Sequence, residues 1–333
     1  MYTLAFFDTK PYDRIWFDKL KGDYDVDFRY FENKLNADTA VMAKGTDGVV
    51  AFVNDIIDAR TIDTLSELGI DLIAMRCAGY NNIDIDAARG KVRVLRVPRY
   101  SPHAVAEHGI AMLLCLNRKL HRAYIRTKDF NFSLNGLTGF DLHGKTLGVI
   151  GTGKIGEEFI KICKGFGMKI LAYDPYPNVE DIKYTDIDSI CHEADIISLN
   201  CPLTKETHHI INRKTIAEMK DGVVILNTSR GALIDSEALL EGLKSKKIGG
   251  AALDVYEEES DIFFEDYSDT IVKDEILTIL LAMPNVLITS HQAFLTNEAL
   301  KAIATVTLEN IKMYFDGREL VNEIKETKVP SNV

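Results

Sequence analysis

Three side chains that could act on one small molecule follow apolar runs in the second half of the sequence. Arg230 follows VVILNTS, Glu259 lies in the acidic stretch after IGGAALDVY, and His291 follows NVLITS. In open parallel sheets, ligands bind outside the carboxyl ends of the strands, so residues that are distant in sequence meet there. The sequence therefore predicts that a guanidinium, a carboxylate and an imidazole converge on one bound molecule.

These residue types suit the reduction of a ketone by hydride. A histidine can give the carbonyl oxygen a proton near neutral pH, and a neighbouring carboxylate favours its protonated form. The planar guanidinium of Arg230 matches a substrate carboxylate. Each residue also has a plainer interpretation, as a structural histidine, a solvated acid or a turn arginine. Spacing alone leaves open which acidic residue at positions 257–259 faces His291.

A nucleotide-binding loop precedes these residues. GTGKIG, at residues 151–156, follows the apolar run TLGVI and opens the helical pattern EEFIKICKGF. Gly151 allows a tight turn, Gly153 lets a pyrophosphate approach, and Gly156 allows close packing of helix on strand. Asp174 ends the next apolar run, where a carboxylate binds the adenosine ribose and repels a 2′-phosphate. The pattern predicts NAD over NADP; the alternative is an ordinary glycine turn between strand and helix.

Apolar and helical runs alternate from residue 2 to about 98, and again from DLHGKTLGVI to about His291. Almost wholly apolar strands are typical of parallel sheets covered on both faces, so we expect an α/β protein with two doubly wound parallel-sheet domains. A long amphipathic helix is expected from Pro102 to about Leu120, and another from Asn297 to Asp316. We expect residues 1–100 and 296–333 to form one domain and residues 101–295 the other.

The composition of the sequence argues against several classes of function. The net charge of −11 disfavours partners such as nucleic acid or anionic membranes, and the sequence shows no basic patch. The N-terminus, MYTLAFFD, predicts a first β-strand and no signal peptide, and the apolar stretches are too short to span a bilayer. Five cysteines without a CxxC pair favour a cytoplasmic protein. We expect no metal site, because His208, His209, His103 and His108 lack ligand spacing with a cysteine or carboxylate.

The sequence resembles the D-isomer-specific 2-hydroxyacid dehydrogenase family over essentially its whole length. The segments that carry the resemblance are AGYNNID, SPHAVAEHGIAML, GTGKIG, NTSRGALID, GGAALDVYE and HQAFLT. The resemblance implies a Rossmann-type NAD domain and a flavodoxin-like substrate domain. Because the loop EEESDIFFEDYS and HQAFLT are similar to those of fermentative D-lactate dehydrogenases, it also implies reversible reduction of pyruvate to D-lactate with NADH.

Roles follow from the resemblance by position. Arg230 resembles the arginine that binds and polarises the substrate, His291 the acid/base, and Glu259 its partner, with Glu257 as the fallback. Asp254 resembles the aspartate that holds the nicotinamide carboxamide. The cofactor positions are Gly151, Gly153, Lys154, Ile155, Gly156, Asp174, Cys201, Pro202, Thr207, Thr228, Ser229 and Asp254. The substrate positions, besides Arg230, are Ala78, Gly79, Tyr100 and Phe294.

The resemblance also implies motion and assembly. Hinges near Tyr100 and Phe294 would let the domains close, bringing Gly79 toward Arg230, and the segment from Ser101 to about Thr138 would pair two subunits in a homodimer. Two alternatives stay open. One is a dehydrogenase for a bulkier D-2-hydroxy acid, and the other is an NAD-sensing binding protein similar to the corepressors of this family, which usually carry extra peptide-binding surface or tails.

Overall fold

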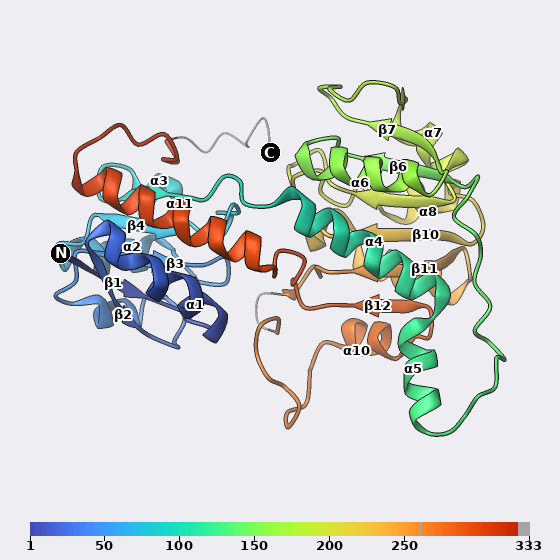
Figure 1. Cartoon of the computed structure of the whole chain (residues 1–333), viewed down its shortest axis with the longest axis horizontal. Helices are drawn as coiled ribbons and strands as arrows, with labels where there is room; N and C mark the ends of the chain where they lie inside the picture. The colour runs from blue at the N-terminus through green and yellow to red at the C-terminus, as the bar shows by residue number, and fades with distance from the viewer. Residues whose placement is uncertain (260–261, 326–333) are drawn as a thin grey trace. The chain divides into compact units, whose positions relative to one another are not determined.

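The structure is a computed structural model that describes residues 1–259 and 262–325. The chain divides into two compact units. The first unit contains Met1–Ser101 and the C-terminal segment that begins at Leu295, and the second contains Pro102–Phe294 (Figure 1). In the part of the chain that the structure describes, no helix combines the length and the apolar character needed to cross a membrane.

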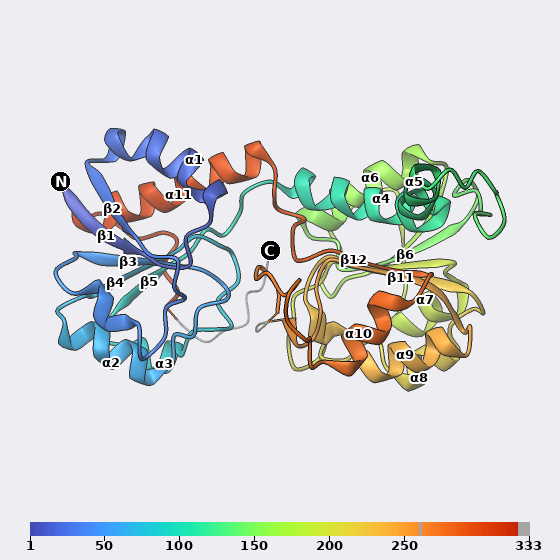
Figure 2. The ribbon, with the colours of Figure 1, turned by 90° about the horizontal axis from the view of Figure 1, so that it is seen from below.

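The described part of the first unit contains a five-stranded parallel sheet with the order β2-β1-β3-β4-β5, which is the flavodoxin-like order. Its strands are β1 (Tyr2–Phe6), β2 (Val26–Tyr30), β3 (Gly48–Ala51), β4 (Leu72–Met75) and β5 (Arg93–Leu95). Helices α1 (Pro11–Leu20) and α11 (Asn297–Phe315) cover one face, and α2 (Ala59–Glu67) and α3 (Ile85–Ala88) cover the other (Figure 2). The central strands β3 and β4 are buried throughout, as a sheet with two covered faces requires.

The second unit contains, among its described residues, a seven-stranded parallel sheet with the order β12-β11-β10-β9-β6-β7-β8. Its strands are β6 (Thr146–Ile150), β7 (Lys169–Tyr173), β8 (Lys183–Tyr184), β9 (Ile196–Leu199), β10 (Val223–Asn227), β11 (Ile248–Leu253) and β12 (Val286–Ile288). The chain runs outward from β6 to β8 and then crosses to β9 on the other side of β6. This reversal is the switch point at which Rossmann-type sheets bind dinucleotides.

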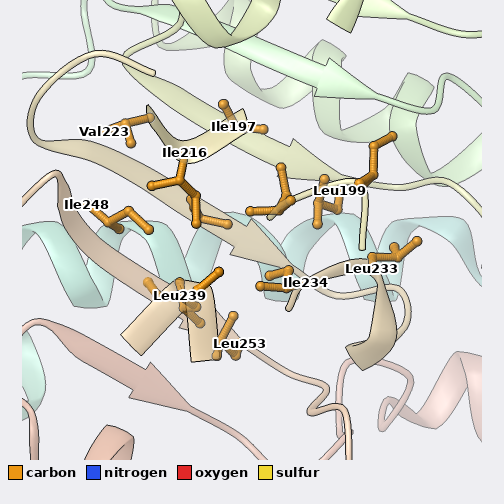
Figure 3. Packing of buried hydrophobic residues seen from close by; sticks show 14 of the residues in the cluster. Ile197, Leu199, Ile216, Val223, Leu233, Ile234, Leu239, Ile248 and Leu253 are labelled. Atoms are coloured by element: carbon orange, nitrogen blue, oxygen red, sulfur yellow. The ribbon is translucent and has the colours of Figure 1, made fainter. Parts of the chain in front are cut away.

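Helices cover both faces of this second sheet (Figure 2). One face carries α4 (Pro102–Arg118) and α6 (Lys154–Gly165), and the other carries α7 (Ile187–Glu193), α8 (Arg213–Glu218), α9 (Ser236–Lys244) and α10 (Glu275–Ala282). Figure 3 shows the hydrophobic core between the sheet and helices α7–α10. Branched residues such as Ile216, Leu239 and Ile248 interdigitate there. The predicted α/β class with two doubly wound parallel sheets is confirmed.

The predicted helix from Pro102 to about Leu120 is too long. It ends at Arg118 because Lys119 is left-handed, with φ of 52°, and a separate helix α5 (Leu120–Lys128) follows. The other long helix ends at Phe315, one residue before the predicted end. Lysine rarely adopts the left-handed conformation, so nothing in the local sequence marks this break.

Candidate active site

Asp254, at the end of β11, holds the turn that carries His291. Its carboxylate is fully buried and accepts hydrogen bonds from Thr289 Oγ1 at 2.6 Å and from the backbone N–H groups of Gln292 and Ala293 at 2.9 Å each. The N–H of His291 donates to the Asp254 carbonyl oxygen at 2.7 Å. His291 has a left-handed backbone, with φ of 52°, so its position depends on these contacts.

Glu259 is the carboxylate that faces His291. Its Oε1 lies 2.8 Å from His291 Nδ1, and its Oε2 accepts the Tyr256 N–H at 2.8 Å. The two side chains are 18% and 19% exposed. A carboxylate at Nδ1 keeps the proton of the neutral imidazole there and directs Nε2 toward other partners. Glu257, the fallback, instead places Oε1 2.5 Å from His209 Nε2.

Arg230 lies in the loop that follows β10. Its backbone is extended, its Nη1 donates to the Ser229 carbonyl oxygen at 2.7 Å, and its own carbonyl oxygen accepts Asn227 Nδ2 at 2.8 Å. A Cβ added to Gly231 would lie 2.0 Å from the Tyr256 carbonyl carbon. The loop with Arg230 therefore packs directly on the backbone that leads from Asp254 to Glu259.

Two glycines of the nucleotide-binding loop lie in close backbone contacts that leave no room for a side chain. Gly151 has φ of +96°, and a Cβ there would lie 2.6 Å from the Asn200 carbonyl carbon. A Cβ at Gly156 would lie 2.2 Å from the Gly151 carbonyl oxygen. Helix α6 starts directly after Gly153, with Lys154 and Ile155 in its first turn, so its free N–H groups lie at this loop. These residues fit a bound dinucleotide.

Asp174 lies beside the glycine loop at the end of β7. Its Oδ2 accepts the Thr152 N–H at 2.7 Å, and its Oδ1 accepts the Tyr176 N–H at 2.8 Å. These bonds hold the carboxylate next to the turn between β6 and α6. The position is the one from which a ribose diol is recognised in this fold.

The loop after β9 lies against the glycine loop and is tied to the Arg230 loop. Ser229 Oγ donates to the Cys201 carbonyl oxygen at 2.6 Å, and Thr207 Oγ1 donates to that of Pro202 at 2.7 Å. Burial raises the pKa of the Cys201 thiol to about 12, so it is not a reactive thiolate. Thr228 is half-buried at the end of β10. These cofactor positions share one edge of the sheet.

The predicted substrate positions are divided between the two units. Ala78 and Gly79 follow β4 in the first unit, where Arg96 Nη1 donates to the Ala78 carbonyl oxygen at 3.0 Å and Cys77 Sγ donates to that of Gly79 at 3.3 Å. Tyr100 also belongs to the first unit. Phe294 is buried at the end of the second unit, which also contains Arg230 and His291.

Two histidines have partners that the sequence did not reveal. His108, on α4, lies with Nε2 3.3 Å from Asp254 Oδ1 and 3.2 Å from Thr289 Oγ1. His209 faces Glu257, although the sequence suggested no carboxylate partner. That suggestion was wrong because the sequence separation of 48 residues hides a contact between two strand-end loops.

Comparisons with known proteins identify relatives that cover nearly the whole chain. Residues 110–293 match the family described as D-isomer specific 2-hydroxyacid dehydrogenase, NAD binding domain. The chain is 48% identical to a D-lactate dehydrogenase of Escherichia coli, over 96% of this chain and 99% of that protein. A pyruvate reductase structure from Chlamydomonas reinhardtii superposes with a TM-score of 0.92 at 42% identity, covering 97% of this chain and 98% of that one. A D-2-hydroxyisocaproate dehydrogenase structure gives 0.85 at 30% identity, covering 97% and 100%.

Proposed function

Because this chain belongs to the D-isomer-specific 2-hydroxyacid dehydrogenase family, we propose that it is a D-lactate dehydrogenase that reversibly reduces pyruvate with NADH. The observation that carries the proposal is the 2.8 Å contact between His291 Nδ1 and Glu259 Oε1. The pair follows β11 and β12, at the same carboxyl edge of the sheet as the glycine loop. The 48% identity to a D-lactate dehydrogenase over nearly both full lengths supports the choice of substrate.

The residues divide the reaction between them. The glycine loop and Asp174 would hold NADH, which when bound would supply the hydride for the carbonyl carbon. Protonated His291 gives the carbonyl oxygen a proton from Nε2, and Glu259 stabilises the imidazolium through Nδ1. Arg230 binds the substrate carboxylate and polarises the carbonyl. In the reverse direction, neutral His291 removes the hydroxyl proton of D-lactate.

Asp254 and His108 act on this centre as positioning residues. The Asp254 carboxylate fixes the Thr289–Ala293 turn, and His108 Nε2 contacts the same carboxylate and the Thr289 hydroxyl. This geometry favours a role for Asp254 in orienting His291, in addition to the carboxamide contact that the family resemblance implies. In the glycine loop, Gly151 allows the tight turn, Gly153 lets the pyrophosphate approach, Gly156 allows the close packing of the helix, and Asp174 selects NADH over NADPH.

The first unit carries the other substrate positions that the family resemblance implies. Residues 1–100 and 296–333 form the substrate-binding domain and residues 101–295 the NAD-binding domain, with Tyr100 and Phe294 at the hinges. The backbone N–H groups of Ala78 and Gly79 receive the substrate carboxylate when the domains close. The enzyme acts in the cytoplasm, in fermentation, as a homodimer or a larger homo-oligomer.

The test is NADH oxidation with a panel of 2-keto acids, followed by chiral analysis of the product. We expect pyruvate to be preferred, the product to be D-lactate, and NADH to exceed NADPH by at least about 100-fold in kcat/KM, or roughly 2.7 kcal/mol. The Asp174→Ala variant should reduce that cofactor ratio. L-lactate as the product, or equal rates with both cofactors, would contradict the proposal.

A second candidate is a dehydrogenase for a bulkier D-2-hydroxy acid. The likeness to a D-2-hydroxyisocaproate dehydrogenase structure, at 30% identity, keeps this substrate class in view. Higher kcat/KM with 4-methyl-2-oxopentanoate or phenylpyruvate than with pyruvate would favour it. An absence of turnover with every keto acid, despite NADH binding, would instead favour the NAD-sensing alternative.

A further inference from the structure

We propose that His208, His209 and Glu257 form a binding site for a divalent metal ion of the zinc type. The two histidines lie in the loop that follows β9, and Glu257 lies in the loop that follows β11. One ligand atom from each residue can be chosen so that all three atoms lie within 4.8 Å of one another. Two strand-end loops therefore bring two imidazoles and a carboxylate together.

Two of the three ligands are already held in place. The backbone of His209 is fixed by hydrogen bonds from its N–H to the Ala232 carbonyl oxygen at 2.9 Å and from Asn212 Nδ2 to its own carbonyl oxygen at 2.7 Å. Its Nε2 lies 2.5 Å from Glu257 Oε1, while Glu257 Oε2 accepts the Ser236 N–H at 3.2 Å. A metal ion would thus meet an oriented imidazole and an oriented carboxylate.

His208 is the adjustable ligand. Its side chain is exposed, and its ring stacks on that of His209 with centroids 3.9 Å apart and an angle of 28° between the ring planes. Ligand atoms about 2 Å from a tetrahedral zinc ion lie roughly 3.3 Å from one another. The exposed His208 ring can rotate toward the site, and the contact between His209 Nε2 and Glu257 Oε1 must open from 2.5 Å to roughly 3.3 Å.

The ligand set selects the class of metal. Two imidazole nitrogens and one carboxylate oxygen suit Zn²⁺ and its transition-metal neighbours, whereas Mg²⁺ and Ca²⁺ prefer oxygen ligands throughout. Three protein ligands leave a fourth tetrahedral position for water. Metal ions bind the deprotonated forms of imidazole and carboxylate ligands, so the affinity for the ion should rise with pH.

Occupancy would link two loops that are separate in the sequence. The loop after β9 also contains Cys201 and Thr207, and the loop after β11 also contains Glu259. An ion that binds the folded protein and not the unfolded chain raises its stability by mass action. We therefore expect Zn²⁺ to raise the thermal midpoint of the protein.

The experiment titrates Zn²⁺ into the metal-free, full-length protein, without a histidine tag, in competition with a coloured chelator. The His208→Gln variant removes one ligand at an exposed position, and Glu257→Gln removes the carboxylate. The control is His192→Gln, because His192 faces one carboxylate, Glu218, at 2.9 Å on the surface without belonging to the cluster of three ligands.

We expect wild type and His192→Gln to bind one Zn²⁺ per chain, with a raised thermal midpoint. We expect His208→Gln and Glu257→Gln to bind Zn²⁺ at least about 10-fold more weakly than wild type. Loss of a residue that only hydrogen-bonds to a metal ligand already costs about that much affinity. His208→Gln should keep the midpoint of the metal-free wild type, which separates lost ligation from lost folding. The proposal is overturned if wild type binds no Zn²⁺, or if His208→Gln binds it as tightly as wild type does.

Discussion

The carboxyl ends of the two parallel sheets both collect charged side chains, but at different depths. In the first unit, Asp8 follows β1 and Arg76 follows β4, and both are at most 2% exposed. Arg76 Nη1 lies 3.3 Å from Asp13 Oδ1, and Arg76 Nη2 donates to the Asp8 carbonyl oxygen at 2.6 Å. In the second unit, His291 and Glu259 keep 18% and 19% of their side-chain surface.

Depth changes what these charges can do. Burial raises the pKa of Asp55 to about 7 and that of Tyr12 to about 12, and it raises the pKa of Asp13 even though Arg76 opposes the shift. Charges this deep hold the strand ends together. A change in their protonation state therefore changes the stability of the fold. His291 and Glu259 at the second edge are accessible enough to meet a substrate. The same topological position thus holds buried charges in one unit and the partly exposed pair of the proposed active site in the other.

The largest effect should come from His291→Asn, because the variant removes the proton donor. Asparagine tolerates the left-handed backbone of this position, so the fold should be kept. We expect kcat for pyruvate reduction to fall about 1,000-fold, within the usual range for a general acid, with NADH binding unchanged. Steady-state kinetics measure the first and fluorescence titration the second. Turnover near the wild-type value would contradict the proposed catalytic role of His291.

Arg76→Met should act on stability. It keeps an apolar stem under the Phe52 ring, whose centroid lies 4.0 Å from the guanidinium carbon, but removes the cation that pairs with Asp13 and leaves Lys10 beside Asp8. We expect the free energy of unfolding at pH 7 to fall by about 3–5 kcal/mol, measured by urea denaturation. The control is Lys91→Met, at an exposed pair with Asp63, where the loss should stay below about 1 kcal/mol. Equal losses would show that depth does not matter.

Asp55→Asn should change the pH dependence of stability. The pKa of Asp55 is raised in the folded state to about 7, so its contribution is fully present below the ordinary aspartate pKa of about 4 and is lost as pH rises through 7. An asparagine cannot ionise. The difference in unfolding free energy between wild type and variant should therefore move in the variant's favour between pH 4 and 8. A constant difference would mean that folding does not raise the pKa of Asp55.

Local patterns in the sequence predicted the fold class well. Apolar strands alternating with helices indicated two parallel sheets, and GTGKIG with Asp174 marked the turn after β6. The contacts that arrange the edges were not predictable, because they join loops that are distant in sequence. Asp254 reaches Gln292 across 38 residues, Glu257 reaches His209 across 48, and Asp8 reaches Arg76 across 68. Only the strand order brings these loops together.

The central claim, that His291 and Glu259 form the proton-transferring pair, is tested most directly by the pH profile of pyruvate reduction in Glu259→Gln. The amide keeps the shape and a hydrogen bond but removes the charge that favours the protonated imidazole. We predict that the alkaline limb of kcat/KM moves to lower pH in Glu259→Gln and stays in place in Glu257→Gln, whose carboxylate faces His209. An unshifted profile in Glu259→Gln, or a shift in Glu257→Gln alone, would contradict the account.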